Sequence, residues 1–348
     1  MLSQNHRVKN DKEECKKQTT TEVNSVKIKK PICSSRPFGF IRSFGVNSFK
    51  GYYKKDNEDR VSVIINITKT KNSNKKWPKH LSYFGLFDGH GGNKCCNFVV
   101  DNFHEYLIRS PNFPNDIEKA LCDAFNSSEN DFLNNYALGK NNELLNQSGS
   151  CGLVTVISDQ MCYIANVGDS RAILSASGGK EIFQLTNDHK PNSEKEKKRI
   201  KKRGGVVYKT NPFQSIFRVI PGNLSVSRTI GDAESKIPFY GGKEGVIIPT
   251  PEITKFRIDE KKFDFILMGC DGIFDKSDNV DLVKGIFNFI ENKRYKYYDI
   301  HKLSGKCTNF AIKFAMNNNS QDNLSSIFIS FPFFEQFVNN HTATNDIA

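Results

Sequence analysis

Residues 151–186 read CGLVTVISDQMCYIANVGDSRAILSASGGKEIFQLT, and this stretch decides the fold class. It contains four short runs rich in β-branched and other apolar residues. Turn-forming residues separate the runs at 159–160, 168–170 and 178–179. Short apolar runs joined by such turns are typical of antiparallel strands. The stretch therefore predicts a four-stranded antiparallel meander.

Outward from the meander, the hydrophobic period changes to that of helices. Apolar residues recur at helical spacing between 95 and 107, and Asn115 with Glu118 three residues later predicts the start of a second helix. Beyond the meander, similar patterns cover 283–290 and 303–314. Helix pairs separated by runs of hairpin strands favour a layered protein with antiparallel sheets, because parallel sheets need alternating strands and helices.

The same pass along the chain predicts its domain organisation. Residues 1–37 are rich in Lys, Asn, Thr and Ser without a hydrophobic period, so we expect a flexible basic arm. Residues 38–334 form the folded domain, within which 188–250 is an insertion or flap rich in Gly and Pro. Residues 335–348 are expected to be a short polar tail.

The composition excludes several classes of protein. The 348 residues include 28 Phe and 11 Tyr, which is too many for a wholly disordered chain. No stretch approaches the roughly 18 continuous apolar residues of a membrane span, and the charged start lacks the apolar segment of a signal peptide. The nine cysteines include no CxxC pair and lie mostly in apolar runs, which favours thiols in a reducing compartment. We expect a cytoplasmic protein, with the nucleus as a second location because of the lysine-rich arm.

The net charge of +12 raises nucleic-acid binding as an alternative function. Three segments, 1–35, 69–79 and 188–204, carry +4, +5 and +5, so the rest of the chain is slightly acidic. Nucleic-acid sites interleave aromatic residues with basic ones, and 188–204 contains no aromatic residue. No nucleic-acid partner is therefore expected.

Four aspartates stand where a predicted strand starts or stops: Asp59, Asp88, Asp271 and Asp322. A single aspartate at a strand end is commonly a turn residue, but strand ends of one sheet or sandwich converge easily. Hard divalent cations such as Mg²⁺ and Mn²⁺ prefer carboxylate and carbonyl oxygens. The absence of His and Cys pairs at zinc spacing argues against zinc. The four aspartates therefore predict a site for Mg²⁺ or Mn²⁺.

The chain resembles the metal-dependent protein serine/threonine phosphatases of type 2C over about residues 38–332. The matching motifs stand in the order of that family: KKDNED (54–59), FGLFDGHGG (84–92), SGSCGLVTVI (148–157), IANVGDSRAIL (164–174), LTNDHKP (185–191), EKKRIKKRGGVV (196–207), LSVSRTIGD (224–232), TPEI (250–253), LMGCDGIFD (267–275) and SQDNLSSIFI (320–329). The resemblance implies an α+β fold, a four-layer α-β-β-α sandwich of two antiparallel sheets flanked by antiparallel helix pairs.

The resemblance also implies the site. It makes Asp88 a bridge between two ions and places the Gly89 carbonyl on one of them. The remaining metal contacts that it implies are Asp59, Asp271 and Asp322 directly, Glu58 through water, and Asp169 with Asp275 at a weaker third ion. A turn role for Asp169 stays open. His90 matches the general acid that protonates the departing serine or threonine oxygen, and a hydrogen bond to metal-bound water is its alternative role.

One motif departs from the family, because the phosphate-holding arginine is replaced by Lys54 or Lys55. Lysine is a point charge without the bidentate fork of arginine, so weaker phosphate positioning is expected. The spacing leaves the choice open, and Lys54 is favoured. The implied activity is hydrolysis of phosphoserine and phosphothreonine on protein substrates by water, without a phospho-enzyme, in a monomeric protein. The alternative within the family is a silent member that acts as a binding module, which loss of a metal aspartate would indicate.

Overall fold

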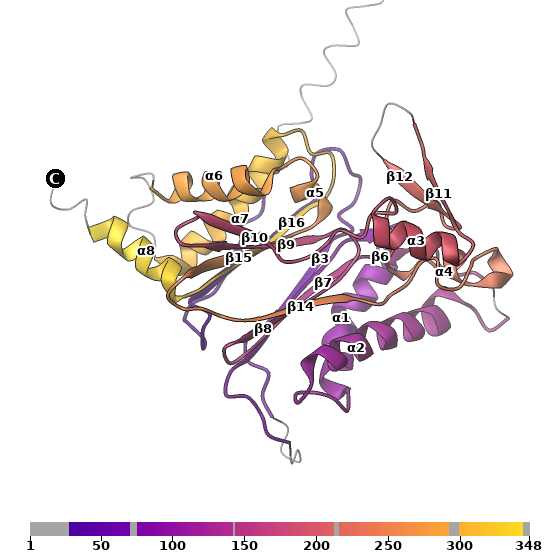
Figure 1. The fold of residues 1–348 in the computed structure, drawn as a ribbon, viewed down its shortest axis with the longest axis horizontal. Helices are drawn as coiled ribbons and strands as arrows, with labels where there is room; N and C mark the ends of the chain where they lie inside the picture. Colours follow the sequence, from indigo (N-terminus) through magenta and orange to yellow (C-terminus); the bar gives the residue numbers. More distant parts are fainter. Residues whose placement is uncertain (1–27, 70–74, 142, 212–215, 292–298, 344–348) are drawn as a thin grey trace, which may run out of the picture.

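The computed structural model describes residues 28–69, 75–141, 143–211, 216–291 and 299–343, and its centre is a sandwich of two antiparallel sheets (Figure 1). The larger sheet has six strands in the spatial order β1 (Ile32–Cys33), β2 (Ser43–Phe49), β16 (Leu324–Ser330), β15 (Phe263–Gly269), β9 (Arg171–Ala176) and β10 (Glu181–Gln184). The second sheet has five strands in the order β14 (Glu252–Arg257), β8 (Met161–Val167), β7 (Gly152–Ser158), β4 (Leu81–Phe87) and β3 (Arg60–Ile64).

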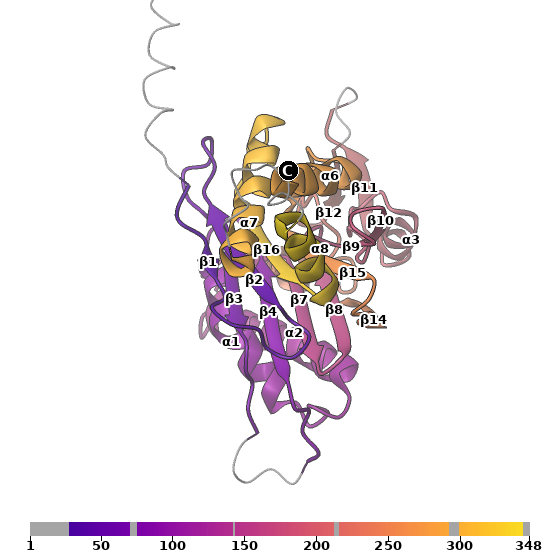
Figure 2. The same cartoon turned by 90° about the vertical axis from the view of Figure 1, so that its left-hand side faces the viewer.

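Helices cover the outer face of each sheet. α1 (Lys94–Arg109) and α2 (Ile117–Phe132) lie on the five-stranded sheet, and the short η1 (Leu133–Ala137) continues α2. α6 (Asn279–Glu291), α7 (Ile300–Asn317) and α8 (Pro332–Ala343) lie on the six-stranded sheet (Figure 2). The layer order is therefore helix, sheet, sheet, helix, which confirms the predicted α+β sandwich.

The chain forms these layers because of its apolar pattern. The strands β4, β7, β15 and β16 are almost entirely buried, since one face of each meets the other sheet and the opposite face meets helices. α7 approaches β2 closely, because a Cβ on Gly45 would lie 2.4 Å from the Ser304 carbonyl oxygen. None of the described helices is long and apolar enough to cross a lipid bilayer.

The flap lies beside the sandwich and has a small core of its own. It contains α3 (Glu194–Lys202), the hairpin β11 (Val206–Lys209) and β12 (Phe217–Ile220), α4 (Ala233–Lys236) and η2 (Pro238–Tyr240). Its buried apolar residues are Ile200, Val219, Val246 and Ile247. Near the sandwich, β13 (Ile230–Gly231), β6 (Gly149–Ser150) and β5 (Gly89–His90) form a short three-stranded sheet.

The prediction of a single meander over 151–186 is wrong. β7 and β8 pair with each other in the five-stranded sheet, whereas β9 and β10 pair in the six-stranded sheet. The chain changes sheet at Gly168-Asp169-Ser170, which the sequence suggested was a hairpin turn. Gly168 has φ 109°, which only glycine adopts without strain, and such a bend serves a hairpin and a crossing equally well.

The structure also differs from the expected domain limits. The arm predicted for 1–37 includes β1, which pairs with β2, while residues 1–27 lie outside the described part. The tail predicted from 335 begins inside α8, whose Val338 is 6% exposed and packs in the main core. The second helix is capped by Asp116, which accepts a hydrogen bond from the Lys119 backbone N–H, and not by Asn115.

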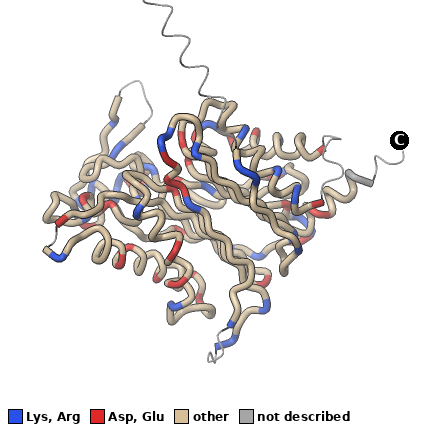
Figure 3. The backbone as a smooth tube through the Cα atoms, turned by 180° about the vertical axis from the view of Figure 1, so that it is seen from behind, with Lys and Arg blue, Asp and Glu red and all other residues tan. Residues whose placement is uncertain are grey.

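Charges of both signs are distributed over the described part of the chain. In the view of Figure 3, Lys and Arg residues alternate with Asp and Glu along the tube, so neither sign covers this face. The basic helix α3 is an example, because its first turn carries the acidic Glu194 and Glu196 and its last turn carries the basic Arg199, Lys201 and Lys202. This arrangement suits the helix dipole, which favours acidic residues in the first turn and basic residues in the last turn.

Candidate metal centre

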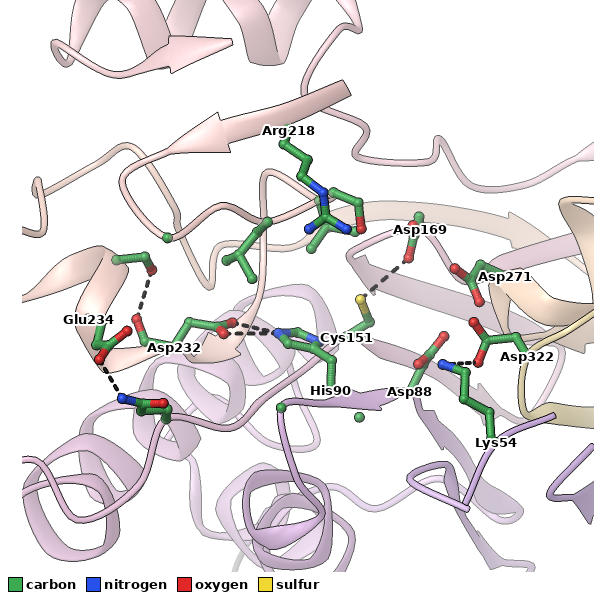
Figure 4. A pocket seen from close by; sticks show the side chains of 18 residues that line it. Lys54, Asp88, His90, Cys151, Asp169, Arg218, Asp232, Glu234, Asp271 and Asp322 are labelled. Atoms are coloured by element: carbon green, nitrogen blue, oxygen red, sulfur yellow. Dashed lines mark hydrogen bonds and ion pairs between the residues drawn. The ribbon is translucent and has the colours of Figure 1, made fainter. Parts of the chain in front are cut away.

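A pocket of about 500 Å³ lies where the ends of the two sheets meet the flap (Figure 4). Its lining is acidic: Asp88, Asp169, Asp232, Glu234, Asp271 and Asp322 contribute to it, with Lys54, His90 and Arg218. These residues come from segments far apart in the sequence. The pocket is large enough for a ligand of several groups, as is usual for small-molecule sites.

Asp88 is the residue around which the carboxylates gather. It follows β4 directly and belongs to two groups whose potential ligand atoms all lie within 4.8 Å of one another. One group joins Asp88 with Asp59 and Cys270, and the other joins it with Asp169 and Asp271. Asp88 is thus shared by the two groups, and its role as a bridge between two ions stays a prediction.

The electrostatics of these carboxylates fit a cation. Asp59 is 3% exposed, and no described residue donates a hydrogen bond to either of its carboxylate oxygens. The Ser325 hydroxyl and the Cys270 thiol lie near, but they donate to Ser48 and to the Asn323 carbonyl instead. Burial raises the pKa of Asp59 to about 6. Burial and then the neighbouring carboxylates raise the pKa values of Asp88 and Asp271 well above the ordinary range. A divalent cation would remove this repulsion.

The backbone around Asp88 is held at close range. A Cβ on Gly89 would lie 2.6 Å from the Glu58 carbonyl oxygen, so only glycine fits between β5 and the 54–59 loop. Glu58 points to the same region, because its Oε1 accepts a hydrogen bond of 2.7 Å from the Gly92 N–H. Gly89 and Glu58 thus lie beside Asp88, and their contacts with an ion, through the Gly89 carbonyl and through water, stay predictions.

Lys54 lines the pocket together with the aspartates, whereas Lys55 is exposed and lies outside the pocket. The Lys54 ammonium is 2.7 Å from Asp322 Oδ1. Partial burial would lower the pKa of Lys54, but Asp322 holds it above its ordinary value. Asp322 thus lines the pocket beside the two acidic groups and is paired with Lys54.

Asp169 and Asp275 share a cation that belongs to the protein. Lys190 Nζ lies 2.5 Å from Asp169 Oδ2 and 3.6 Å from Asp275 Oδ1. Burial would lower the pKa of Lys190, but these carboxylates raise it above its ordinary value, so the lysine stays charged. A third ion at this position would have to displace the Lys190 ammonium, which gives a physical reason for weak binding.

His90 is held by Asp232, a residue of the flap that the sequence analysis did not assign. The His90 Nε2 atom is 2.9 Å from both carboxylate oxygens of Asp232. Burial would lower the pKa of His90, but the Asp232 charge and hydrogen bond raise it overall. Gly149 makes this contact possible, because a Cβ there would lie 2.1 Å from Asp232 Oδ2. The pair can hold a protonated imidazole in a fixed orientation.

Three contributors to the site were missed from the sequence: Asp232, Lys190 and Cys270. Asp232 and Lys190 stand in the quoted motifs LSVSRTIGD and LTNDHKP, so the family resemblance marked the segments but not the roles. Asp232 also has the left-handed φ of 53°, which is uncommon outside glycine. No pattern in the sequence signals that Cys270 lies with Asp59 and Asp88.

The chain is similar in sequence to known proteins that share one family description. A family model described as Protein phosphatase 2C matches residues 43–324. The chain is 32% identical over 295 residues to "Protein phosphatase 2C homolog 2" of Hypocrea jecorina, which covers 83% of this chain and 62% of that protein. It is 33% identical over 250 residues to "Probable protein phosphatase 2C 27" of Arabidopsis thaliana, covering 72% of this chain and 59% of the relative. The chain thus spans about three fifths of the length of these relatives.

Solved structures show the same fold. A phosphatase from a pathogenic strain of Toxoplasma gondii has a TM-score of 0.66 at 19% identity and covers 84% of this chain and 94% of its own. A Caenorhabditis elegans sex-determining protein has a TM-score of 0.67 at 22% identity, covering 87% of this chain and 67% of its own. At these identities the likeness concerns the fold alone. The family match, which extends over most of the chain, shows that this chain belongs to the protein phosphatase 2C family.

Proposed function

We propose that this chain is a metal-dependent phosphatase that hydrolyses phosphoserine and phosphothreonine in proteins. The observation that carries the proposal is the position of Asp88, which belongs to two acidic groups at once. The family match of the chain to Protein phosphatase 2C supports the same activity. A carboxylate that shares two such groups is suited to bridge two cations. The expectations of a monomer in the cytoplasm, with the nucleus as a second location, remain predictions.

The proposed ligands are two Mg²⁺ or Mn²⁺ ions held by Asp88 with the Gly89 carbonyl, Asp59, Asp271 and Asp322, and by Glu58 through water. The choice of hard cations rests on the donor set, which consists mainly of carboxylate and carbonyl oxygens. Asp169 and Asp275 are the proposed ligands of a weaker third ion in competition with Lys190. Ions bound there would supply Lewis acidity and would lower the pKa of a water molecule, which makes water a nucleophile at neutral pH.

Two side chains of the protein would then bind the phosphate and protonate the leaving oxygen. Lys54 is placed to hold the phosphate, since its ammonium lies in the pocket beside Asp322. His90 presents Nε2 to Asp232, which leaves Nδ1 to carry the proton that the departing serine or threonine oxygen needs. Asp232 keeps the imidazolium stable until that transfer. No covalent phospho-enzyme is required.

The test is phosphate release from a phosphothreonine peptide by the full chain, with added Mn²⁺ or Mg²⁺ and with a chelator. We expect activity with metal, loss with chelator, and loss in Asp88→Asn. Asp101→Asn is the matched control, because Asp101 is an exposed aspartate on α1 away from the pocket. Circular dichroism confirms that each variant is folded.

A folded Asp88→Asn protein with unchanged turnover would contradict the two-cation proposal. A wild-type chain that binds the peptide without releasing phosphate would instead favour the silent, peptide-binding member of the family. The sequence retains all four strand-end aspartates, so no observation favours that alternative.

A further inference from the structure

Arg218 brings a positive charge from the flap into the pocket. It lies on β12, opposite Tyr208 of β11, and its neighbour Val219 is fully buried in the flap core. Because successive side chains of a strand point to opposite faces, Arg218 points away from that core, and its side chain lines the pocket (Figure 4). The hairpin thus fixes which residue reaches the site.

Within the described part of the chain, no acidic side chain pairs with the Arg218 guanidinium. Among the residues that the structure describes, it makes one hydrogen bond, from Nη1 to the Asn223 carbonyl at 2.5 Å, and no carboxylate lies within ion-pairing distance. The other permanent cation of the lining, Lys54, is paired with Asp322. Of the two acidic flap residues in the lining, Asp232 is paired with His90, and Glu234 accepts a hydrogen bond from Gln147. Arg218 therefore keeps Nε and Nη2 for an anion from outside the protein.

The guanidinium is held in place by its turn. Asn223 has the left-handed φ of 53°, and the Tyr208 hydroxyl donates a hydrogen bond to the Asn223 side chain. The same turn packs on α4, since a Cβ on Gly222 would lie 2.6 Å from the Ser235 Cβ. A guanidinium anchored through one nitrogen presents its remaining N–H groups as a rigid fork, which matches carboxylate and phosphate oxygens.

We propose that Arg218 binds a second anionic group of the substrate, separate from the phosphate that is hydrolysed. The inference rests on the proposed function and names its substrate class: phosphorylated segments with an acidic side chain or a second phosphate near the reacting residue. Figure 4 shows Arg218 extending from the flap strand, whereas Lys54, Asp88 and Asp322 lie on the other side of the pocket. A pocket of about 500 Å³ has room for both groups.

The test compares three phosphothreonine peptides that differ only beside the phosphothreonine: one carries alanines, one glutamates and one a second phosphoserine. We expect wild-type kcat/KM to be about 10-fold higher for the two anionic peptides, since charge-assisted hydrogen bonds are the stronger class. In Arg218→Gln the ratio of anionic to neutral peptide falls to near one, mainly through KM, and Arg218→Lys is intermediate. Lys202→Gln removes an exposed flap charge outside the pocket and should retain the wild-type ratio.

An equal loss on all three peptides and on p-nitrophenyl phosphate would overturn the inference, because Arg218 would then hold the reacting phosphate. A wild-type ratio near one would overturn it as well. A preference for only one of the two anionic peptides would identify the source of the anion. Peptide affinity is measured separately by fluorescence anisotropy, so a chain that binds the anionic peptides through Arg218 but hydrolyses none would support the inference while contradicting the proposed function.

Discussion

Asp59 shows how a single side chain couples metal binding to stability. Its pKa of about 6 lies above the 3.8 of an ordinary aspartate, because the enclosed carboxylate loses hydration. Without metal, the folded chain therefore binds this proton more tightly than the unfolded chain. The free energy of unfolding must fall as pH rises from about 4 to about 6. At neutral pH, the difference between these two pKa values corresponds to a loss of about 3 kcal/mol in the free energy of unfolding.

We expect Asp59→Asn to stabilise the metal-free protein at pH 7 by roughly 2 to 3 kcal/mol and to flatten this decline. The measurement is urea unfolding with chelator between pH 4 and pH 7. Asp101→Asn serves as the exposed control and should leave the profile unchanged. If Asp59→Asn kept the wild-type slope, the carboxylate would not be the group that costs stability.

His90 should matter most where the leaving group is poor. An alkoxide of threonine needs protonation, whereas p-nitrophenolate leaves readily as an anion, so His90→Gln should lose about 10²-fold or more on phosphothreonine peptide and far less on p-nitrophenyl phosphate. The Asp232 carboxylate raises the pKa of His90, so the acid form persists to higher pH in the wild type. The alkaline fall in kcat should flatten in the variant. Equal losses on both substrates would assign His90 to ordering water or metal.

Lys54 and Lys55 form a matched pair for testing phosphate binding. Lys54→Ala should raise KM for phosphopeptide, and Lys54→Arg should retain or lower it, because the guanidinium can bind phosphate through two nitrogens. Lys55→Ala removes an equal charge from outside the pocket and should behave as wild type. Steady-state kinetics decide the matter, and a strong effect confined to Lys55 would move the role to that residue.

At the residue scale, the sequence predicted the aspartates because each stands at the boundary of an apolar strand. It did not predict their partners. The His90–Asp232 contact joins residues 142 positions apart, and the Lys190–Asp169 contact crosses from the flap to the sheet bend. Neither spacing follows a period of a helix or strand, so only the fold reveals these pairs.

Between elements, a buried ion pair joins α2 to α4. Lys236 Nζ lies 2.6 Å from Glu129 Oε1, and the two side chains are 9% and 7% exposed. Glu129 Oε2 also accepts a hydrogen bond of 2.8 Å from the Gly231 N–H, directly before Asp232. The pair thus fixes the flap segment that carries the partner of His90.

Removing one member of this pair should be costly. We expect Lys236→Met to lower the free energy of unfolding by about 3 to 5 kcal/mol, because Glu129 would remain buried and unpaired. The double variant Lys236→Met with Glu129→Gln leaves no isolated charge and should recover much of the loss. Denaturant unfolding of the two single variants and the double variant measures the coupling, and additive losses would argue against a direct interaction.

The element scale also shows where patterns mislead. Four alternating runs predicted one meander, yet the runs divide between two sheets, because strand pairing depends on partners that are distant in sequence. β9 pairs with β15, and β8 pairs with β14, and in both cases the partner strand lies roughly 90 residues later in the chain. Asn115 and Asp116 are both good capping residues. The hydrogen bond that identifies Asp116 as the cap is visible only in the folded helix.

In the whole molecule, the candidate metal centre draws residues from both sheets. Asp59 and Asp88 border strands of the five-stranded sheet, and Asp271 and Asp322 border strands of the six-stranded sheet. Cations bound there should stabilise the sandwich as one unit. Trp77, the single tryptophan, packs edge to face against Phe113 on the side of the five-stranded sheet and provides a local probe.

We expect Mn²⁺ to raise the melting temperature equally by Trp77 fluorescence and by circular dichroism. At a free Mn²⁺ concentration 100 times the dissociation constant, one bound ion adds about 2.7 kcal/mol to the free energy of unfolding. Asp271→Asn, a change in the other sheet, should abolish the shift that Trp77 reports. A tryptophan signal that moves with metal in this variant, or that stays fixed in the wild type, would show that the sheets respond separately.

The passage from β8 to β9 has a consequence for how the protein keeps its site in register. Three residues, 168–170, carry the chain from one sheet to the other, and Gly168 has no room for a side chain because a Cβ would lie 2.3 Å from Cys151 Sγ. The middle residue of that link is Asp169, within 4.8 Å of Asp88 and Asp271. Because Asp169 belongs to this short link, a change in the distance between the two sheets would also move its carboxylate relative to Asp88 and Asp271. Core packing between the sheets therefore bears directly on the spacing of these carboxylates.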